Sequence, residues 1–149
     1  MLVGVAEDER RDPGRIFAVG PSHSFGQLAD AINTAFGRWD RSHLHEFELD
    51  GARKIGYPDD EFAPEVVWED QAQVKVCSAV APAEEFAFTF DFGEGWLHRC
   101  RVMAQKIEPR AYFGDGPLPK SPLAIFGWGW LPDQYRREWP DDGMLDELD

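Results

Sequence analysis

The sequence predicts an α+β fold, in which one main N-terminal helix packs on a mostly antiparallel sheet of hairpins and an irregular C-terminal wrap rich in Trp, Pro and Gly follows. Three observations lead to this prediction. A capping-box pattern precedes an amphipathic segment near the N-terminus. Two later segments alternate apolar and polar residues, and each ends in a glycine turn. The 149 residues, 43% of them hydrophobic, suit a single domain over residues 1–149.

The helix is predicted over residues 25–36. Ser24 has the residue type of an N-cap, and Gln27 follows three positions later, as a capping box requires. Gly37 comes directly after the segment and is a common helix terminator. The apolar residues recur at helical spacing, at Phe25, Leu28, Ile32 and Phe36. A short strand over residues 15–19 is expected to precede this helix.

A hairpin is predicted over residues 42–57. Residues 42–49 alternate, so that one face of a strand carries His43, His45, Phe47 and Leu49. Asp50-Gly51 is a strong hairpin signal, and residues 53–57 are the expected partner strand. Residues 73–76 also alternate in the manner of a short strand.

A second hairpin follows, and its first strand places Phe86, Phe88, Phe90 and Phe92 on one face. Residues 96–107 are the expected return strand. From Pro109 onward the composition changes to Pro, Gly and aromatic residues, which indicates an irregular wrap over the domain. We therefore expect a core of about residues 15–108 and an extension over residues 109–149 that ends in an acidic tail, Met144–Asp149.

The length of the second glycine turn leaves two registers open. A two-residue loop pairs Asp91 with His98, so that the carboxylate and the imidazole meet on one face. A three-residue loop pairs Phe90 with His98 and turns Asp91 away. Glu94 is a poor first residue for a primed two-residue turn, which favours the three-residue loop.

Two separated motifs, HLHEF at residues 43–47 and FDFGEGWLH at residues 90–98, carry a family resemblance. The chain resembles the plasmid pRiA4b ORF-3-like family, and AFGRW at residues 35–39 and IGYP at residues 55–58 match further family positions. The resemblance covers residues 25–108. It implies an α+β domain found on plasmids, transposable elements and bacterial chromosomes, with a largely unassigned activity and an occasional resolvase-like label. The chain departs from the family pattern in its N-terminal strand and after the return strand, so no role is carried over for those segments.

The net charge is −13, from 28 acidic residues and 15 Lys and Arg. This balance argues against direct nucleic-acid binding, which needs clustered basic residues, and favours a basic protein surface as partner. We therefore expect a non-catalytic interaction protein, and the family resemblance implies an association with mobile elements or with defence and counter-defence. One version of this hypothesis is a nucleic-acid mimic. No secretory segment and no apolar run of about 18 residues is evident, so a cytoplasmic protein without a membrane partner is expected.

The alternative function is a metal-dependent hydrolase. Its candidate ligands are His43, His45, Asp91 and His98, because the first two share a predicted strand face and the last two flank the glycine turn. Such a set would hold a divalent metal such as zinc, with Glu46 or Glu94 as the base for a bound water. A structural interpretation is favoured over this site, because the glycines allow a tight turn and Asp91 can bind turn amides.

The C-terminal stretch IFGWGWLPDQY combines aromatic residues with nearby arginines. The candidates for partner binding are Trp128, Trp130, Tyr135 and Arg136, because Trp, Tyr and Arg are the usual anchors of interfaces. In the other interpretation the rings fold back over the sheet and shield it. The second interpretation is favoured, because small domains seldom expose so much aromatic area.

Overall fold

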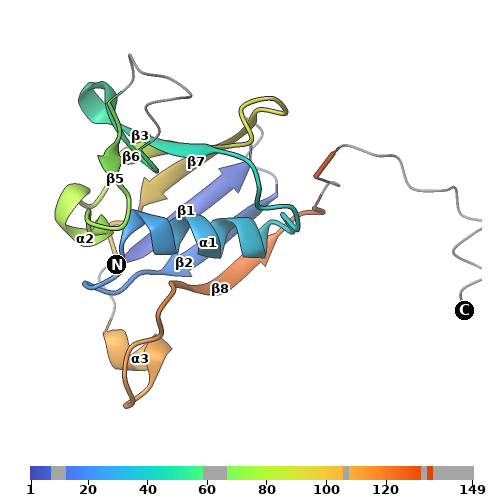
Figure 1. Ribbon diagram of the computed structural model, residues 1–149. Coiled ribbons are helices and arrows are strands. Elements are labelled where there is room, and N and C mark those ends of the chain that lie inside the picture. The colour runs from blue at the N-terminus through green and yellow to red at the C-terminus, as the bar shows by residue number, and fades with distance from the viewer. Residues whose placement is uncertain (8–12, 59–66, 106–107, 132–133, 136–149) are drawn as a thin grey trace, which may run out of the picture.

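An eight-stranded sheet forms the centre of the protein in a computed structural model, which describes residues 1–7, 13–58, 67–105, 108–131 and 134–135 (Figure 1). The strand order is β5-β4-β3-β6-β7-β1-β2-β8. Neighbouring strands are antiparallel except β4 and β5, so the α+β class is confirmed and the sheet is mixed. The strands are β1 (Leu2–Glu7), β2 (Gly14–Ala18), β3 (His45–Leu49), β4 (Arg53–Gly56), β5 (Glu69–Asp70), β6 (Glu85–Phe90), β7 (Trp96–Val102) and β8 (Leu123–Trp128).

Helix α1 (Phe25–Ala35) lies across one face of this sheet (Figure 1). The predicted capping box is present: the Gln27 amide donates to Ser24 Oγ at 3.2 Å, and the Ser24 amide donates to Gln27 Oε1 at 2.9 Å. Phe25 is buried, and its ring contacts Phe47 with 5.0 Å between centroids. The apolar side of the helix therefore packs on the sheet, and helix and sheet form two layers. No helix among the described residues is long and apolar enough to cross a membrane.

The sequence does not predict strand β1, which lies in the middle of the sheet between β7 and β2. Val3 and Val5 are fully buried, so the core extends beyond the expected residues 15–108. Gly4 and Ala6 point to the opposite face and are small rather than polar. An alternating strand is recognised in a sequence by polar residues between the apolar ones. Because Gly4 and Ala6 are not polar, β1 has only the pattern of a short apolar run.

The C-terminal segment is more regular than the predicted wrap. A short helix, α3 (Pro109–Phe113), leads to β8, which pairs with β2 and forms an edge of the sheet. Gly14 leaves room for this strand, because a Cβ there would lie 2.0 Å from the Trp128 ring. The predicted acidic tail, residues 144–149, lies outside the described residues.

Several local predictions are settled by the structure. The Asp50-Gly51 hairpin is confirmed, with Gly51 at a φ of 77°, and the strand predicted over residues 15–19 is β2. Residues 73–76 do not form a strand: they lead into the one-turn helix α2 (Val76–Ala79), and Lys75 makes an isolated bridge. Phe92 lies beyond β6, and β7 ends at Val102.

The two faces of the sheet differ. The face under α1, called the helix face below, carries buried side chains such as Phe47, Phe88 and His98. The opposite face, called the open face, carries mostly exposed or half-exposed side chains, and no described helix packs on it (Figure 1). One row across the open face, from β3 to β8, consists of Glu48, Ala87, Arg99, Ala6, Gly14 and Trp128.

Candidate functional site

The turn between β6 and β7 is longer than either predicted register allows. Phe90 pairs with Trp96 and Phe88 pairs with His98, so residues 91–95 form the loop. Both expected pairings of His98, with Asp91 and with Phe90, are therefore wrong. Asp91 begins the loop with a φ of 59°, a left-handed conformation that Asp tolerates better than most residues.

Asp91 is buried and organises this loop. Its Oδ1 accepts hydrogen bonds from the amides of Gly93 at 3.2 Å and Glu94 at 3.3 Å. Its own amide donates to the Leu44 carbonyl at 2.8 Å, which joins the loop to the segment before β3. Its Oδ2 is buried without a hydrogen-bond partner among the described residues. These contacts support the structural interpretation, in which Asp91 holds the turn.

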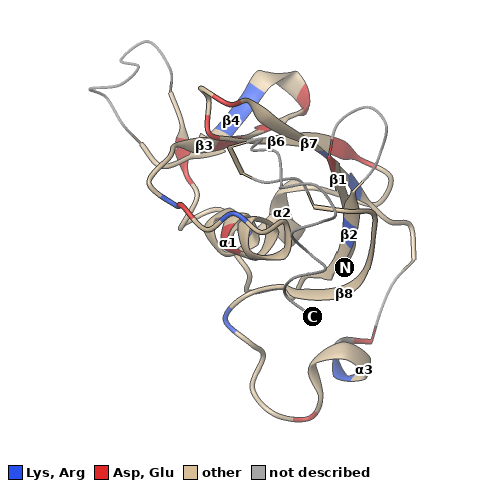
Figure 2. Cartoon of the chain, turned by 90° about the vertical axis from the view of Figure 1, so that its right-hand side faces the viewer, with Lys and Arg blue, Asp and Glu red and all other residues tan. Residues whose placement is uncertain are grey.

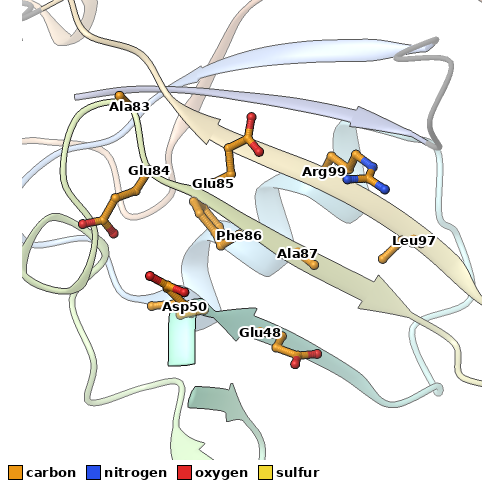
Figure 3. Close-up of a pocket in the computed structure, with 10 residues that line it drawn as sticks. Glu48, Asp50, Ala83, Glu84, Glu85, Phe86, Ala87, Leu97 and Arg99 are labelled. Carbon is orange, nitrogen blue, oxygen red and sulfur yellow. The ribbon is translucent and has the colours of Figure 1, made fainter. Parts of the chain in front are cut away.

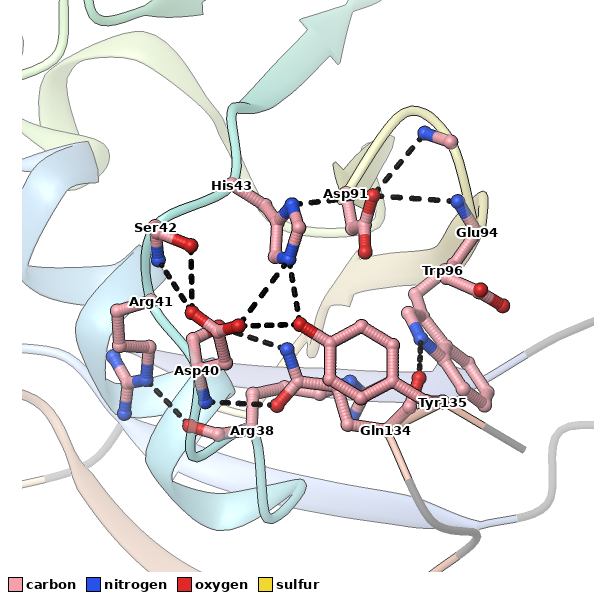
Figure 4. A network of polar contacts seen from close by, with 11 residues as sticks. Arg38, Asp40, Arg41, Ser42, His43, Asp91, Glu94, Trp96, Gln134 and Tyr135 are labelled. Atoms are coloured by element: carbon pink, nitrogen blue, oxygen red, sulfur yellow. Dashed lines mark hydrogen bonds and ion pairs between the residues drawn. The ribbon is translucent and has the colours of Figure 1, made fainter. Parts of the chain in front are cut away.

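His43 precedes β3, which begins at His45, so the two histidines do not share a strand face as predicted. The His43 ring lies between two loops (Figure 4). Its Nδ1 is 3.6 Å from Asp91 Oδ1, while its Nε2 is 2.8 Å from the Tyr135 hydroxyl and 3.6 Å from Asp40 Oδ2. Two of the four candidate metal ligands, His43 and Asp91, therefore lie next to each other.

The other two candidate ligands have different partners on the helix face. His45 Nε2 is 2.6 Å from the Gln71 side-chain oxygen, and burial lowers the pKa of His45. The rings of His45 and His98 both contact Phe88, with 5.6 and 5.3 Å between centroids, and Phe88 separates them. In the described part of the chain, no group of three or more His, Cys, Asp or Glu side chains is arranged to hold a metal ion.

The two predicted bases do not face the His43–Asp91 pair. Glu46 points to the open face, where it accepts hydrogen bonds from Trp68 at 2.8 Å and Lys54 at 3.3 Å. Glu94 lies in the β6–β7 loop, and its carboxylate points away from His43 (Figure 4).

A buried arginine, Arg38, lies beside this loop. Its guanidinium covers the Trp96 ring at 4.4 Å from the centroid and pairs with Glu7 Oε1 at 3.5 Å. Burial, and then the charge of Arg38, lowers the pKa of His98 to about 3. The neutral His98 ring can donate from Nδ1 to the Phe88 carbonyl, 3.0 Å away, and accept at Nε2 from Arg38, 3.3 Å away.

Gln134 and Tyr135 bring a distant segment to the same place (Figure 4). The Asp40 amide donates to Gln134 Oε1 at 2.9 Å, and Gln134 Nε2 donates to the Asp40 carbonyl at 2.8 Å. The Trp96 indole donates to the Gln134 carbonyl at 2.8 Å, and the Tyr135 hydroxyl donates to the Asp40 carboxylate. We call this assembly the motif cluster; it consists of Asp40, His43, Asp91, Trp96, Gln134 and Tyr135.

The motif cluster holds a proton on Tyr135 and a charge on Asp40. Hydrogen bonds from Ser42 and then from Tyr135 lower the pKa of Asp40 to about 2. The hydrogen bond to Asp40 raises the pKa of Tyr135 to about 12. Ser42 Oγ also donates to Asp40, at 2.7 Å. Both hydroxyls donate to the Asp40 carboxylate, so the cluster joins the C-terminal segment to the chain between α1 and β3.

The open face carries a groove of about 570 Å³ between the end of β3 and the start of β6 (Figure 3). Leu97 and Arg99 of β7 close its other side. The carboxylates that line it, called the groove acids below, are Glu48, Asp50, Glu84 and Glu85. None of the groove acids forms an ion pair with another described residue.

The predicted aromatic partner-binding residues have separate surroundings. Tyr135 belongs to the motif cluster, whereas Trp128 lies on the open face with 38% of its surface exposed. Trp130 is 95% exposed, so it does not fold back over the sheet as expected. Arg136 lies outside the described residues.

Several residues of these sites are not predicted from the sequence. Arg38 and Asp40 flank Trp39 of the AFGRW motif, and their nearness to a family motif is the signal that could have identified them. Gln134 has no such signal, because it is one polar residue in an irregular segment. The groove acids come from two hairpins, and they appear together only when β3 and β6 are placed side by side.

Three comparisons with known proteins concern the family and the fold of the chain. The family described as plasmid pRiA4b ORF-3-like protein matches residues 7–116, so the chain belongs to that family. One similar solved structure is a protein of unknown function from Methanosarcina mazei Go1, with a TM-score of 0.67 and 24% identity over 99% of this chain and 79% of that chain. This likeness shows the fold alone. No curated protein matches the chain.

Proposed function

We propose that this member of the plasmid pRiA4b ORF-3-like family is a non-catalytic interaction protein that binds a basic segment of a partner protein on its open face. The observation that carries the proposal is the set of four groove acids around one depression. Their charges are not neutralised by ion pairs within the described chain, so a Lys or Arg side chain of a partner would be attracted to them. The groove volume of about 570 Å³ is in the range of ligand sites.

The chemistry of the groove also supports the finer version of this proposal. Carboxylates spaced along a surface can occupy a basic groove that normally receives phosphates, which is the principle of a nucleic-acid mimic. The net charge of −13 gives such a surface a long-range attraction for basic proteins. We place this activity with mobile elements or with defence and counter-defence, in line with the plasmid origin in the family description.

Binding of an oligolysine peptide, measured by fluorescence anisotropy over a range of NaCl concentrations, tests the proposal. We expect affinity that falls steeply with salt, because exposed charges are screened. A triple variant, Glu48→Gln, Glu84→Gln and Glu85→Gln, should bind far more weakly than the wild type. The matched control changes three exposed acids elsewhere, Asp30→Asn, Glu108→Gln and Asp115→Asn, and therefore the same charge. Equal losses in both triple variants, or salt-insensitive binding, would contradict a role for the groove.

The alternative, a metal-dependent hydrolase, stays a prediction. The contact of 3.6 Å between His43 and Asp91 is the observation in its favour. Metal analysis of the purified protein, with His43→Ala and Asp91→Asn as variants, tests it directly. Stoichiometric metal that both variants lose would support the alternative, and a metal-free, fully folded protein would oppose it.

A further inference from the structure

Strand β8 forms an open edge of the sheet. It pairs with β2 on one side, and no described strand pairs with its other side. We propose that this edge binds a second copy of the chain: the two β8 strands pair antiparallel about a twofold axis and join the two sheets into one. The proposal concerns self-association and does not depend on the function proposed for the groove acids.

The side chains of β8 support an interface. Every residue of Leu123–Trp128 is exposed or half-exposed, and Phe126 is 61% exposed. Trp130, two residues beyond the strand, is 95% exposed. The Phe126 and Trp128 rings lie beside each other, with 6.2 Å between centroids. Monomeric proteins seldom expose neighbouring aromatic rings, which more often mark an interaction site.

The strand also lacks the charges by which proteins usually protect sheet edges. The segment LAIFGW contains no charged residue and no proline, and its β-branched and aromatic residues favour strand pairing. One irregularity is present, a register shift opposite Ile16 and Phe17. The other edge of the sheet, β5, contrasts with this one: it has two residues, Glu69 and Asp70, and both are acidic.

Charge favours a second copy over a basic partner at this edge. The groove acids lie on β3, β6 and the turns beside them, at a distance of several strands from β8 in the sheet order. Figure 2 shows β8 without an acidic or basic residue. Arg15 lies against the strand and donates from Nη1 to the Trp128 carbonyl at 2.9 Å, and β8 itself carries no carboxylate. A basic protein would therefore be attracted elsewhere, whereas two molecules of charge −13 meet with least repulsion away from their carboxylates. An antiparallel strand is complementary to itself, so one uncharged segment suffices for both sides of a twofold interface.

Self-association of this kind has a distinctive dependence on salt. Two chains of charge −13 repel each other through the rest of their surfaces, and salt screens this repulsion. We therefore expect the dimer to become stronger as NaCl is added. Attraction of a basic segment to the groove acids weakens under the same conditions.

Sedimentation equilibrium of the full chain over a range of protein and NaCl concentrations tests the proposal. The mass should rise from that of one chain, 16.9 kDa, to that of two, and should not exceed it. A mass of one chain at every concentration and salt would overturn the proposal. Assemblies that grow beyond two chains would overturn the twofold pairing.

Three substitutions of exposed apolar residues locate the interface. Phe126→Glu should abolish the dimer, because it brings two carboxylates together at the shared edge. Leu97→Glu replaces another exposed apolar side chain of the open face, on β7 and away from the edge, and should leave the dimer intact. Trp130→Glu lies outside every strand and cannot disturb the sheet; it should weaken the dimer about tenfold or more, even if Phe126→Glu does not fold. Equal dimerisation of the Phe126→Glu and Leu97→Glu proteins, or no effect of Trp130→Glu, would contradict the proposal.

Discussion

The helix face and the open face belong to the same strands but use charged residues in opposite ways. On the helix face, Arg38 is buried against Trp96 and paired with Glu7, and His98 is held neutral between fixed partners. On the open face, the groove acids remain exposed and without ion pairs among the described residues. We infer that the family motifs maintain the fold and that contact with other molecules takes place on the open face and its edge. The predictions below test this division by the stability of matched variants.

The largest difference is expected between two apolar residues on opposite faces. Phe88 is fully buried at the centre of the helix face, and Phe88→Ala should lower the free energy of unfolding by about 3–5 kcal/mol. Leu97 is 42% exposed on the open face, and Leu97→Ala should lower it by less than about 1 kcal/mol. Urea denaturation of both variants measures the difference. Comparable losses would show that the open face is covered in solution.

A second comparison sets a buried ion pair against an exposed one. Arg38→Ala removes the Arg38 charge from beside the buried Glu7 carboxylate and should cost about 3–5 kcal/mol of stability. Arg53→Ala breaks the exposed pair with Glu69 and should cost about 0–1 kcal/mol. The same urea experiment applies. An Arg38→Ala protein as stable as Arg53→Ala would show that Arg38 does not stabilise the buried side.

Acid should destabilise the protein through the helix face. The pKa of His98 is about 3 in the folded chain and about 6.5 in the unfolded chain, so between these values the unfolded state binds one more proton. Stability therefore falls as the pH is lowered through this window, by about 1.4 kcal/mol for each pH unit. The lowered pKa of His45 acts in the same direction. NMR of the imidazole protons provides the measurement: a His98 signal that titrates near its ordinary value in the folded protein would refute the assignment.

Local patterns in the sequence predict the parts of this fold that local interactions determine. The capping box at Ser24 and the turn at Gly51 are confirmed, because each depends on hydrogen bonds or backbone angles within a few residues. Strands β1 and β8 are not predicted, because their pairing partners are distant and their small or uniformly apolar residues hide the strand period.

The candidate site was predictable only in part for a similar reason. The motifs point to His43, Asp91 and Trp96, but not to what these residues bind. The observed pairing of Phe88 with His98 depends on a five-residue loop, residues 91–95, which the Asp91 side chain stabilises. The turn preferences used for the prediction describe loops of two or three residues. Gln134 contacts Asp40 and Trp96, which are distant in the sequence, so no local sequence pattern predicts these contacts.

Loss of a single hydroxyl in the motif cluster should have a modest effect. Tyr135→Phe removes the hydrogen bonds to Asp40 and His43 but keeps the ring contacts with Trp39 and His43, so we expect a loss of stability smaller than that of Phe88→Ala or Arg38→Ala. Protease protection of the C-terminal segment provides a second readout. Faster cleavage near residue 135 in Tyr135→Phe, with the sheet still folded, is the expected result; unchanged cleavage would show that the hydroxyl does not anchor the segment.

The smallest effect on stability is expected from the groove acids, and it sharpens the comparison between the faces. Replacing Glu48, Glu84 and Glu85 by Gln should change the free energy of unfolding by no more than about 0.5 kcal/mol per residue, because exposed side chains without ion pairs stabilise little. The sign should be favourable, since three like charges are removed from a chain of charge −13. The same variant should lose the salt-sensitive binding of basic peptides. If the substitutions lower peptide binding and leave the free energy of unfolding unchanged or higher, the groove acids serve contact with other molecules. A marked loss of stability in this variant would instead show that they stabilise the fold.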